Sequence, residues 1–355
     1  LANTTGYQNV SIGHNSSAAN TEGFYNVAVG DNALAANTTG DGNVAIGYNA
    51  LDANTTPNGN TAVGHQSLSS ATTGSALTAI GFNSLLANTT GANNTSVGHE
   101  SLQRLTTAAA CIGVGSRSLE DCTTGSHNVG VGEAALFKVT TGENNTAVSQ
   151  CGLGLTTGNL NVFVGKNSGN NLVSGNNNIF VGCTLSSAAA DTAGQIVMGD
   201  TVTCVGSNHF TFGAGNTDSD IQFGATSITA PSDIRLKEDI QDEEVGLDFI
   251  NDLRPVTFLW KKEKDIPSHF DSYVEGSEER TMNGKYNHGF IAQEVKEVID
   301  NHNLKDGFEM WQENESDGRQ RVAPAALMSV MVKAVQELST TVDELKQELK
   351  TLKGE

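Results

Sequence analysis

The sequence predicts a mainly β protein with a β-roll or β-solenoid shaft, a small α/β domain and a C-terminal coiled-coil helix. Three observations lead to this prediction. A glycine- and asparagine-rich repeat of 17 residues fills the first part of the chain, the composition becomes charged and lysine-rich near residue 232, and a heptad pattern closes the chain. We expect the shaft over residues 1–190, a β-rich neck over 191–231, the α/β domain over 232–323 and the coiled-coil helix over 324–355.

The repeat is marked by a glycine that follows valine or isoleucine and returns every 17 residues. These glycines are Gly13, Gly30, Gly47, Gly64, Gly81, Gly98, Gly115 and Gly132. Ser149 holds the next position, and a deletion of one residue then resets the phase to Gly165, Gly182 and Gly199. A leucine keeps the same step from Leu34 to Leu153, and a Thr-Thr-Gly corner closes most units. Such self-similarity at a fixed period is typical of a solenoid.

Each unit offers two short extended pieces, Ala-Val-Gly and Ala-Leu, and we expect one β-branched residue of the first piece to point inward. One unit has too little apolar surface to fold alone, so stacking of units must form the core. Asparagine and glycine at fixed offsets suit tight turns and left-handed backbone. Asparagines in register can also bond their amides from one turn to the next.

Several motifs in the shaft have a structural interpretation beside a functional one. Asn37 and Asn88 start Asn-Thr-Thr sequons, but their phase with the repeat favours a turn role over glycosylation. His14, His65 and His99 share one phase with aromatic residues, which favours a packed or exposed edge over a metal site. The five cysteines are Cys111, Cys122, Cys151, Cys183 and Cys204. Their spacing suggests neither a zinc site nor a disulfide framework, so we expect buried thiols.

Charge and hydropathy exclude some classes of partner. The chain has 355 residues, with 20 basic against 40 acidic residues and a formal charge of −20. Such a surface repels nucleic acid and anionic membranes. No apolar run approaches membrane-spanning length, and no cofactor motif or signal peptide is visible. The chain opens in the middle of a repeat, so we expect an N-terminal attachment region to precede it.

Downstream of residue 232 the pattern alternates between helix and strand. We expect a helix over 243–251, a strand over 254–260, a polar loop over 261–285, a strand over 286–291 and a helix over 292–301. Residues 310–312 and 321–322 suggest a β-hairpin, and His288 is expected to be a packing or turn residue. From Pro324 the apolar residues follow heptad steps of four and three. They are Met331, Val335, Leu338, Val342, Leu345, Leu349 and Leu352.

The junction between the shaft and the last domain carries a short motif made of Ser232, Asp233, Arg235 and Lys237. It resembles the Ser-Asp-x-Arg-x-Lys start of the intramolecular chaperone domain that ends many phage tail fibres and tailspikes, endosialidases included. The segment Gly289-Phe-Ile-Ala-Gln-Glu-Val295 is similar to one shared by these domains. The resemblance covers about the last third of the chain, and the repeat itself resembles trimeric adhesin heads and phage fibre shafts.

The resemblance implies a self-cleaving dyad in which Ser232 is the nucleophile and Lys237 the general base, with Asp233 and Arg235 in support. Cleavage would fall between Pro231 and Ser232, as a single acyl transfer rather than turnover of an outside substrate. Spacing alone does not bring two residues five apart together, since that requires a turn between them. The heptad residues by themselves favour a two-stranded coil. The resemblance implies three chains, and we therefore expect a homotrimer.

These features predict a phage tail fibre or appendage protein, located in the virion and assembled in the bacterial cytoplasm. Its last domain would template trimerisation of the shaft and then cleave itself. A host cell-surface receptor or glycan would be a further partner. One alternative is a bacterial trimeric adhesin, although the chain does not end in a membrane anchor. Others are the shaft of a glycan-degrading tailspike that lacks its enzymatic part, and a membrane-anchored transcription factor with the same chaperone.

Overall fold

The protein is described by a computed structural model that covers residues 3–215, 217–270, 272–282, 284–304, 308–314 and 317–353. The chain divides into two compact units. Unit 1 spans Leu1–Asp233 and unit 2 spans Ile234–Glu355, and each is described by itself.

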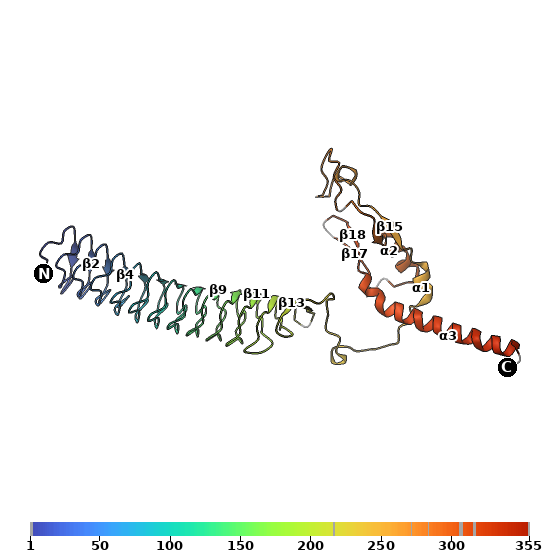
Figure 1. Ribbon diagram of the computed structural model, residues 1–355, viewed down its shortest axis with the longest axis horizontal. Helices are drawn as coiled ribbons and strands as arrows, with labels where there is room; N and C mark the ends of the chain where they lie inside the picture. The colour runs from blue at the N-terminus through green and yellow to red at the C-terminus, as the bar shows by residue number, and fades with distance from the viewer. Residues whose placement is uncertain are drawn as a thin grey trace. The chain divides into compact units, whose positions relative to one another are not determined.

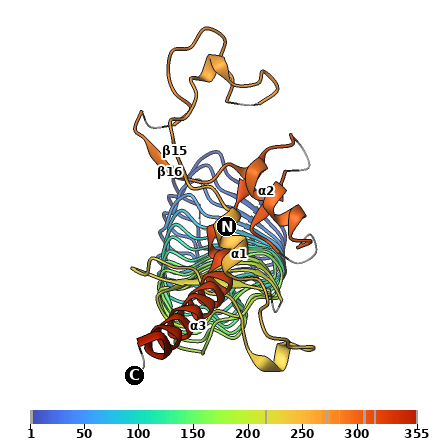
Figure 2. The same ribbon diagram turned by 90° about the vertical axis from the view of Figure 1, so that its right-hand side faces the viewer.

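Unit 1 is a β-solenoid in which fourteen strands form one sheet in chain order (Figure 1). Strands β1 to β13 pair in parallel, and β14 turns back antiparallel to β13. The register advances by one repeat per strand, so that Val27 pairs with Val44 and Val44 with Thr61. Figure 2 shows the turns one behind another. The predicted β-solenoid is therefore confirmed.

The first ten strands have three residues each, and the later ones are slightly longer. Their bounds are β1 (Val10–Ile12), β2 (Val27–Val29), β3 (Val44–Ile46), β4 (Thr61–Val63), β5 (Thr78–Ile80), β6 (Thr95–Val97), β7 (Ile112–Val114), β8 (Val129–Val131), β9 (Thr146–Val148), β10 (Val162–Val164), β11 (Ile179–Cys183), β12 (Ile196–Asp200), β13 (His209–Ala214) and β14 (Ser219–Gln222).

In each strand from β2 to β9 the small central residue points into the coil, and the β-branched residues beside it point outward. In β2, Ala28 is buried while Val27 and Val29 remain partly exposed. The buried central residues of β2 to β12 are Ala28, Ala45, Ala62, Ala79, Ser96, Gly113, Gly130, Ala147, Phe163, Phe180 and Val197. The expectation that a β-branched residue points inward is therefore wrong, because alternation gives that side to the small residue.

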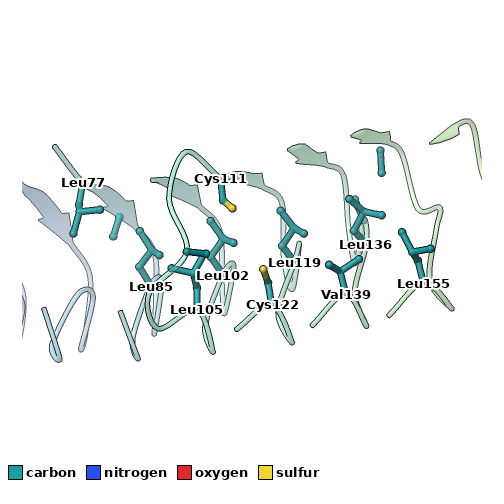
Figure 3. Packing of buried hydrophobic residues seen from close by; sticks show 14 of the residues in the cluster. Leu77, Leu85, Leu102, Leu105, Cys111, Leu119, Cys122, Leu136, Val139 and Leu155 are labelled. Atoms are coloured by element: carbon teal, nitrogen blue, oxygen red, sulfur yellow. The ribbon is translucent and has the colours of Figure 1, made fainter. Parts of the chain in front are cut away.

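The inward volume is filled mainly by leucines, which stack along the coil (Figure 3). The Ala-Leu piece was expected to be extended, but the leucines lie in turns with left-handed backbone. Leu34 has φ 53° and Leu51 has φ 55°. This conformation costs a non-glycine residue about 1–2 kcal/mol, and full burial of the side chain offsets it with about 1.5–3 kcal/mol.

A ladder of buried asparagines links the turns. The backbone N–H of Asn43 donates to Oδ1 of Asn26 at 2.9 Å, and Nδ2 of Asn43 donates to the carbonyl of Pro57 at 3.0 Å. Asn60 repeats the first bond with Asn43 at 3.0 Å. The buried Asn37 amide donates to the Gly40 carbonyl, which supports the turn role predicted for this sequon.

Four of the five cysteines are buried, as expected, and Cys183 is exposed, which corrects the prediction for that residue. All five are free thiols. Burial raises the pKa of the Cys151 thiol to about 12. A thiol with such a pKa stays protonated at neutral pH, so Cys151 serves as a small apolar side chain.

Unit 2 has two antiparallel strand pairs and a helical core. β15 (Val256–Phe258) pairs with β16 (Asn287–Gly289), and β17 (Trp311–Glu313) pairs with β18 (Gln320–Val322), as the predicted hairpin required. The α-helices are α1 (Leu247–Asp252), α2 (Ala292–Asn301) and α3 (Leu327–Lys353). The 3-10 helices are η1 (Ile234–Leu236), η2 (Glu263–Asp265) and η3 (Pro324–Ala326). The first helix begins later than the expected 243.

The core of unit 2 is formed by seven buried residues from helices α1, α2 and α3 and the segments around them. They are Phe249, Leu253, Val295, Ile299, Met310, Leu327 and Val330. Only the first turns of α3 contribute, and its later residues do not enter this core. In the segment Gly289–Val295, Gly289 ends β16 and Val295 is the first buried residue of α2.

Candidate cleavage site

The four motif residues lie on both sides of the boundary between the units. Ser232 and Asp233 end unit 1, and Arg235 and Lys237 belong to unit 2. Arg235 lies in η1, and the backbone N–H of Lys237 donates to the Ile234 carbonyl at 3.2 Å directly after it. The short helix supplies the turn that the spacing of the dyad requires. The pairing of the Ser232 hydroxyl with the Lys237 amine stays a prediction.

The motif is accessible to solvent. Ser232, Arg235 and Lys237 are exposed, and Asp233 is half-buried. Accessibility of the bond between Pro231 and Ser232 suits cleavage. A serine hydroxyl, however, needs a base to take its proton, and lysine is a base only where desolvation disfavours its ammonium form. Lys237 is exposed in this structure.

Downstream, an ion pair joins the segment Gly289–Val295 to the residues just before β15. Nε of Arg254 donates to Oε2 of Glu294 at 2.9 Å, and Nη2 of Arg254 contacts the other carboxylate oxygen. This two-point contact lowers the pKa of Glu294 and raises that of Arg254 through hydrogen bonding. The contact between Arg254 and Glu294 could not be predicted from the sequence, because nothing local links Arg254 to a residue 40 positions later.

An open groove of about 1050 Å³ lies beside the first strand pair of unit 2. Its lining includes Val256, Phe258, Phe290 and Val322. His288 is exposed and lies in the middle of β16 opposite Thr257, so the expectation of a packing or turn residue is wrong. The lining is mainly apolar, and its polar side chains include those of Thr257, His288 and Arg321.

The seven heptad residues of α3 are all exposed. Their exposed fractions run from 40% for Val342 to 84% for Leu352. The stripe starts at Met331, beside the last buried residues of the helix, Val330 and Ala334, and continues to Leu352. An exposed apolar stripe with heptad spacing is typical of a helix that packs against another helix. The coiled coil itself stays a prediction.

The row of histidines and aromatics along unit 1 is a stacked edge. Tyr48, His65, Phe82 and His99 have ring centroids 5.1 to 5.2 Å apart with interplanar angles of 10° to 25°. Both faces of His65 and Phe82 are covered by neighbouring rings, which supports the predicted packed edge. Among the described residues, no group of histidine, cysteine and carboxylate side chains is arranged to hold a metal ion. No helix in the described ranges is long and apolar enough to cross a membrane.

Residues 232–304 match the family described as the chaperone of endosialidase. The match begins at Ser232 and includes the junction motif, the Arg254–Glu294 pair and most of the core helices α1 and α2. This stretch is therefore a domain of that family behind a repeat shaft, which confirms the resemblance found in the sequence. No curated protein and no solved structure matches the chain.

Proposed function

We propose that the protein is a phage tail fibre or appendage whose last domain starts the assembly of three shafts and then cleaves itself from them. The observation that carries the proposal is where the family match starts. Its first residue is Ser232, one residue before the boundary between two separately compact units. A self-removing assembly domain needs its cleavable bond at this kind of boundary.

The outward sheet face of unit 1 supports association of several chains. From β2 to β10, all outward strand positions hold valine, isoleucine or threonine, and no charged residue interrupts them. Ile46, Ile80 and Val148 are 39%, 41% and 43% exposed. Burial of such surface is favourable by about 25 cal/mol for each Å². A continuous apolar face along a thin coil is best covered by the same face of identical chains.

A repetitive shaft has a register problem that a separate domain solves. If two shafts slip by one turn, the outward pattern is almost unchanged, so the wrong register has nearly the same energy. A terminal domain that associates first fixes one register and raises the effective concentration of the remaining segments. The exposed heptad residues of α3 give unit 2 the surface for this step.

The cleavage chemistry is an acyl shift followed by hydrolysis. The Ser232 hydroxyl oxygen attacks the Pro231 carbonyl carbon, and Lys237 takes the hydroxyl proton. The bond from Pro231 to the Ser232 nitrogen breaks, that nitrogen receives the proton, and an ester remains. Water then hydrolyses the ester, so the shaft ends at Pro231. Because Lys237 is exposed in the single chain, we expect cleavage to depend on assembly, which supplies its burial.

Mass analysis of freshly expressed chains tests this function. The unaltered chain should yield a fragment that ends at Pro231, while Ser232→Ala and Lys237→Ala should stay intact. Lys261→Ala, at another exposed lysine of unit 2, should cleave normally. Equal cleavage of all four chains would contradict the assignment of Ser232 and Lys237 as the catalytic dyad. Sedimentation of the released shaft should give three copies, and a single copy would contradict the assembly role.

A further inference from the structure

One turn of the solenoid is a residue shorter than its neighbours, and the missing residue can be placed. In most turns the second residue after the glycine has left-handed backbone, as in Arg117 (φ 57°) and Ala134 (φ 52°). After β9 no residue holds this place. The Cys151 carbonyl accepts the N–H of Leu136, as the Ala135 carbonyl accepts that of Leu119, although Cys151 is only two residues after Ser149.

The shorter turn shifts the residues that follow it. Gly152 now occupies the inward leucine place, and its N–H donates to the Ser168 carbonyl. The expectation that Leu153 continues the buried leucine row is wrong, because this residue moves to the outer corner and is partly exposed. A hollow of about 310 Å³ opens there, and its lining includes Arg117, Phe137, Lys138 and Leu153.

The hollow also collects positive charge. The first 230 residues contain only four lysines and arginines, which are Arg104, Arg117, Lys138 and Lys166. Two of these four line the hollow, in a chain with a net charge of −20. Chance placement along a shaft of this length would seldom put half of its cations around one cavity.

Arg117 is held in place rather than mobile. Its Nε donates to Oε2 of Glu120 at 2.6 Å, and its guanidinium carbon lies 4.5 Å from the centre of the Phe137 ring. Glu120 offsets one positive charge. Lys138 makes no ion pair with a residue that the structure describes, so the lining keeps a net positive charge.

We propose that this hollow binds one anionic saccharide unit of a larger polymer. A carboxylate would be attracted by Lys138 and Arg117, and the apolar face of a sugar ring would lie on the shelf made by Leu153 and Phe137. The size is at the lower end for a small-ligand site, which fits a single ring. A polyphosphate chain fits less well, because it has no apolar ring face to lie against Phe137 and Leu153.

Calorimetric titration of the full chain with a tetramer of galacturonic acid tests the proposal, and a tetramer of galactose is the uncharged probe. The acidic tetramer should bind, more weakly at high salt, and the neutral one at least about fivefold more weakly. Lys138→Gln should weaken binding of the acid about fivefold. Lys166→Gln is the matched control, because it removes the same charge from another exposed position on unit 1, and it should bind normally.

A second variant removes the hollow without a change of charge. Insertion of one alanine between Gln150 and Cys151 restores the length of the regular turn and should abolish binding while thermal stability is kept. Absence of binding by the unaltered chain would overturn the proposal. So would equal binding by Lys138→Gln and Lys166→Gln, or equal binding of the neutral tetramer. Salt-sensitive self-association without saccharide binding would assign the charges to contacts between copies and would also overturn it.

Discussion

Glu337 accepts a hydrogen bond from the backbone N–H of Leu247 at 2.8 Å, although the two residues are 90 positions apart. Leu247 is the first residue of α1, and Glu337 lies in the N-terminal half of α3. The carboxylate therefore satisfies a free N–H at the positive end of a helix. Because α1 has no side-chain cap of its own, its start depends on α3.

Glu337→Ala should lower the free energy of unfolding of unit 2 by about 1 kcal/mol, as loss of a helix cap does. Gly246→Ala should have a similar effect, because a Cβ at residue 246 would lie 2.3 Å from Oε2 of Glu337 and displace the carboxylate. The double variant should cost about as much as either single one, and thermal unfolding measures this. Additive costs would contradict the coupling, and Glu344→Ala, exposed on the same helix, is the control.

Asn43→Ala should destabilise unit 1 by about 2 kcal/mol. The substitution removes the acceptor of the Asn60 N–H and the shorter of two hydrogen bonds to the Pro57 carbonyl, which keeps only the 3.3 Å bond from Nδ2 of Asn54. Asn58→Ala removes an exposed amide from the same array and should cost less than about 0.5 kcal/mol. Denaturant unfolding followed by circular dichroism distinguishes the two. Equal costs would mean that the ladder contributes little.

Asp52→Asn should stabilise unit 1 at neutral pH. Burial is the main cause that raises the pKa of Asp52, and its Oδ1 is buried without a hydrogen bond. A carboxyl whose pKa is raised by folding lowers the free energy of unfolding when it is ionised. This destabilisation is absent below the ordinary pKa of 3.8 and complete above the raised pKa of the folded state. The gain in melting temperature at pH 7 should therefore disappear near pH 3. Asp191→Asn, at an exposed position, should show no such pH-dependent gain.

Ile80→Asp should disrupt association while the solenoid still folds. Ile80 lies on the outward sheet face and is 41% exposed in the single chain, so the monomer should lose no more than about 0.5 kcal/mol. Thr90→Asp introduces the same charge at an exposed corner and should leave association intact. Sedimentation velocity measures the outcome. Assembly that is unaffected by Ile80→Asp would place the interface elsewhere.

The repeat could be predicted from the sequence because residues with one structural role, such as glycine in turns, recur at fixed positions. The glycines at a step of 17 residues give the register that pairs Val27 with Val44. The sequence did not show which side chains of each strand point inward, since Val-Ala-Val can alternate with either the valines or the alanine inside. What decided it is the narrow interior, where the leucines from the opposite side leave room only for alanine, serine or glycine in most turns. A local pattern does not contain that volume constraint.

The candidate site was predictable only as a motif. Ser232 and Lys237 could be singled out from their neighbours, yet their chemistry depends on burial, which no spacing reports. The contacts that hold unit 2 together join distant positions, as Arg254 with Glu294 and Leu247 with Glu337 do. Charged residues of this kind look like ordinary solvated side chains in the sequence. Leu153 was misplaced because the deletion could be detected but not located within its turn.

The one-to-one correspondence between a repeat and a strand has a consequence for how such a molecule changes over generations. Duplication or loss of a whole unit adds or removes one layer of about 4.8 Å and leaves all other layers with the same neighbours. The length of the shaft can therefore vary in equal increments without a change at either end. Units added on the N-terminal side of β9 would leave the irregular layer after β9 at the same distance from the C-terminal end of the shaft.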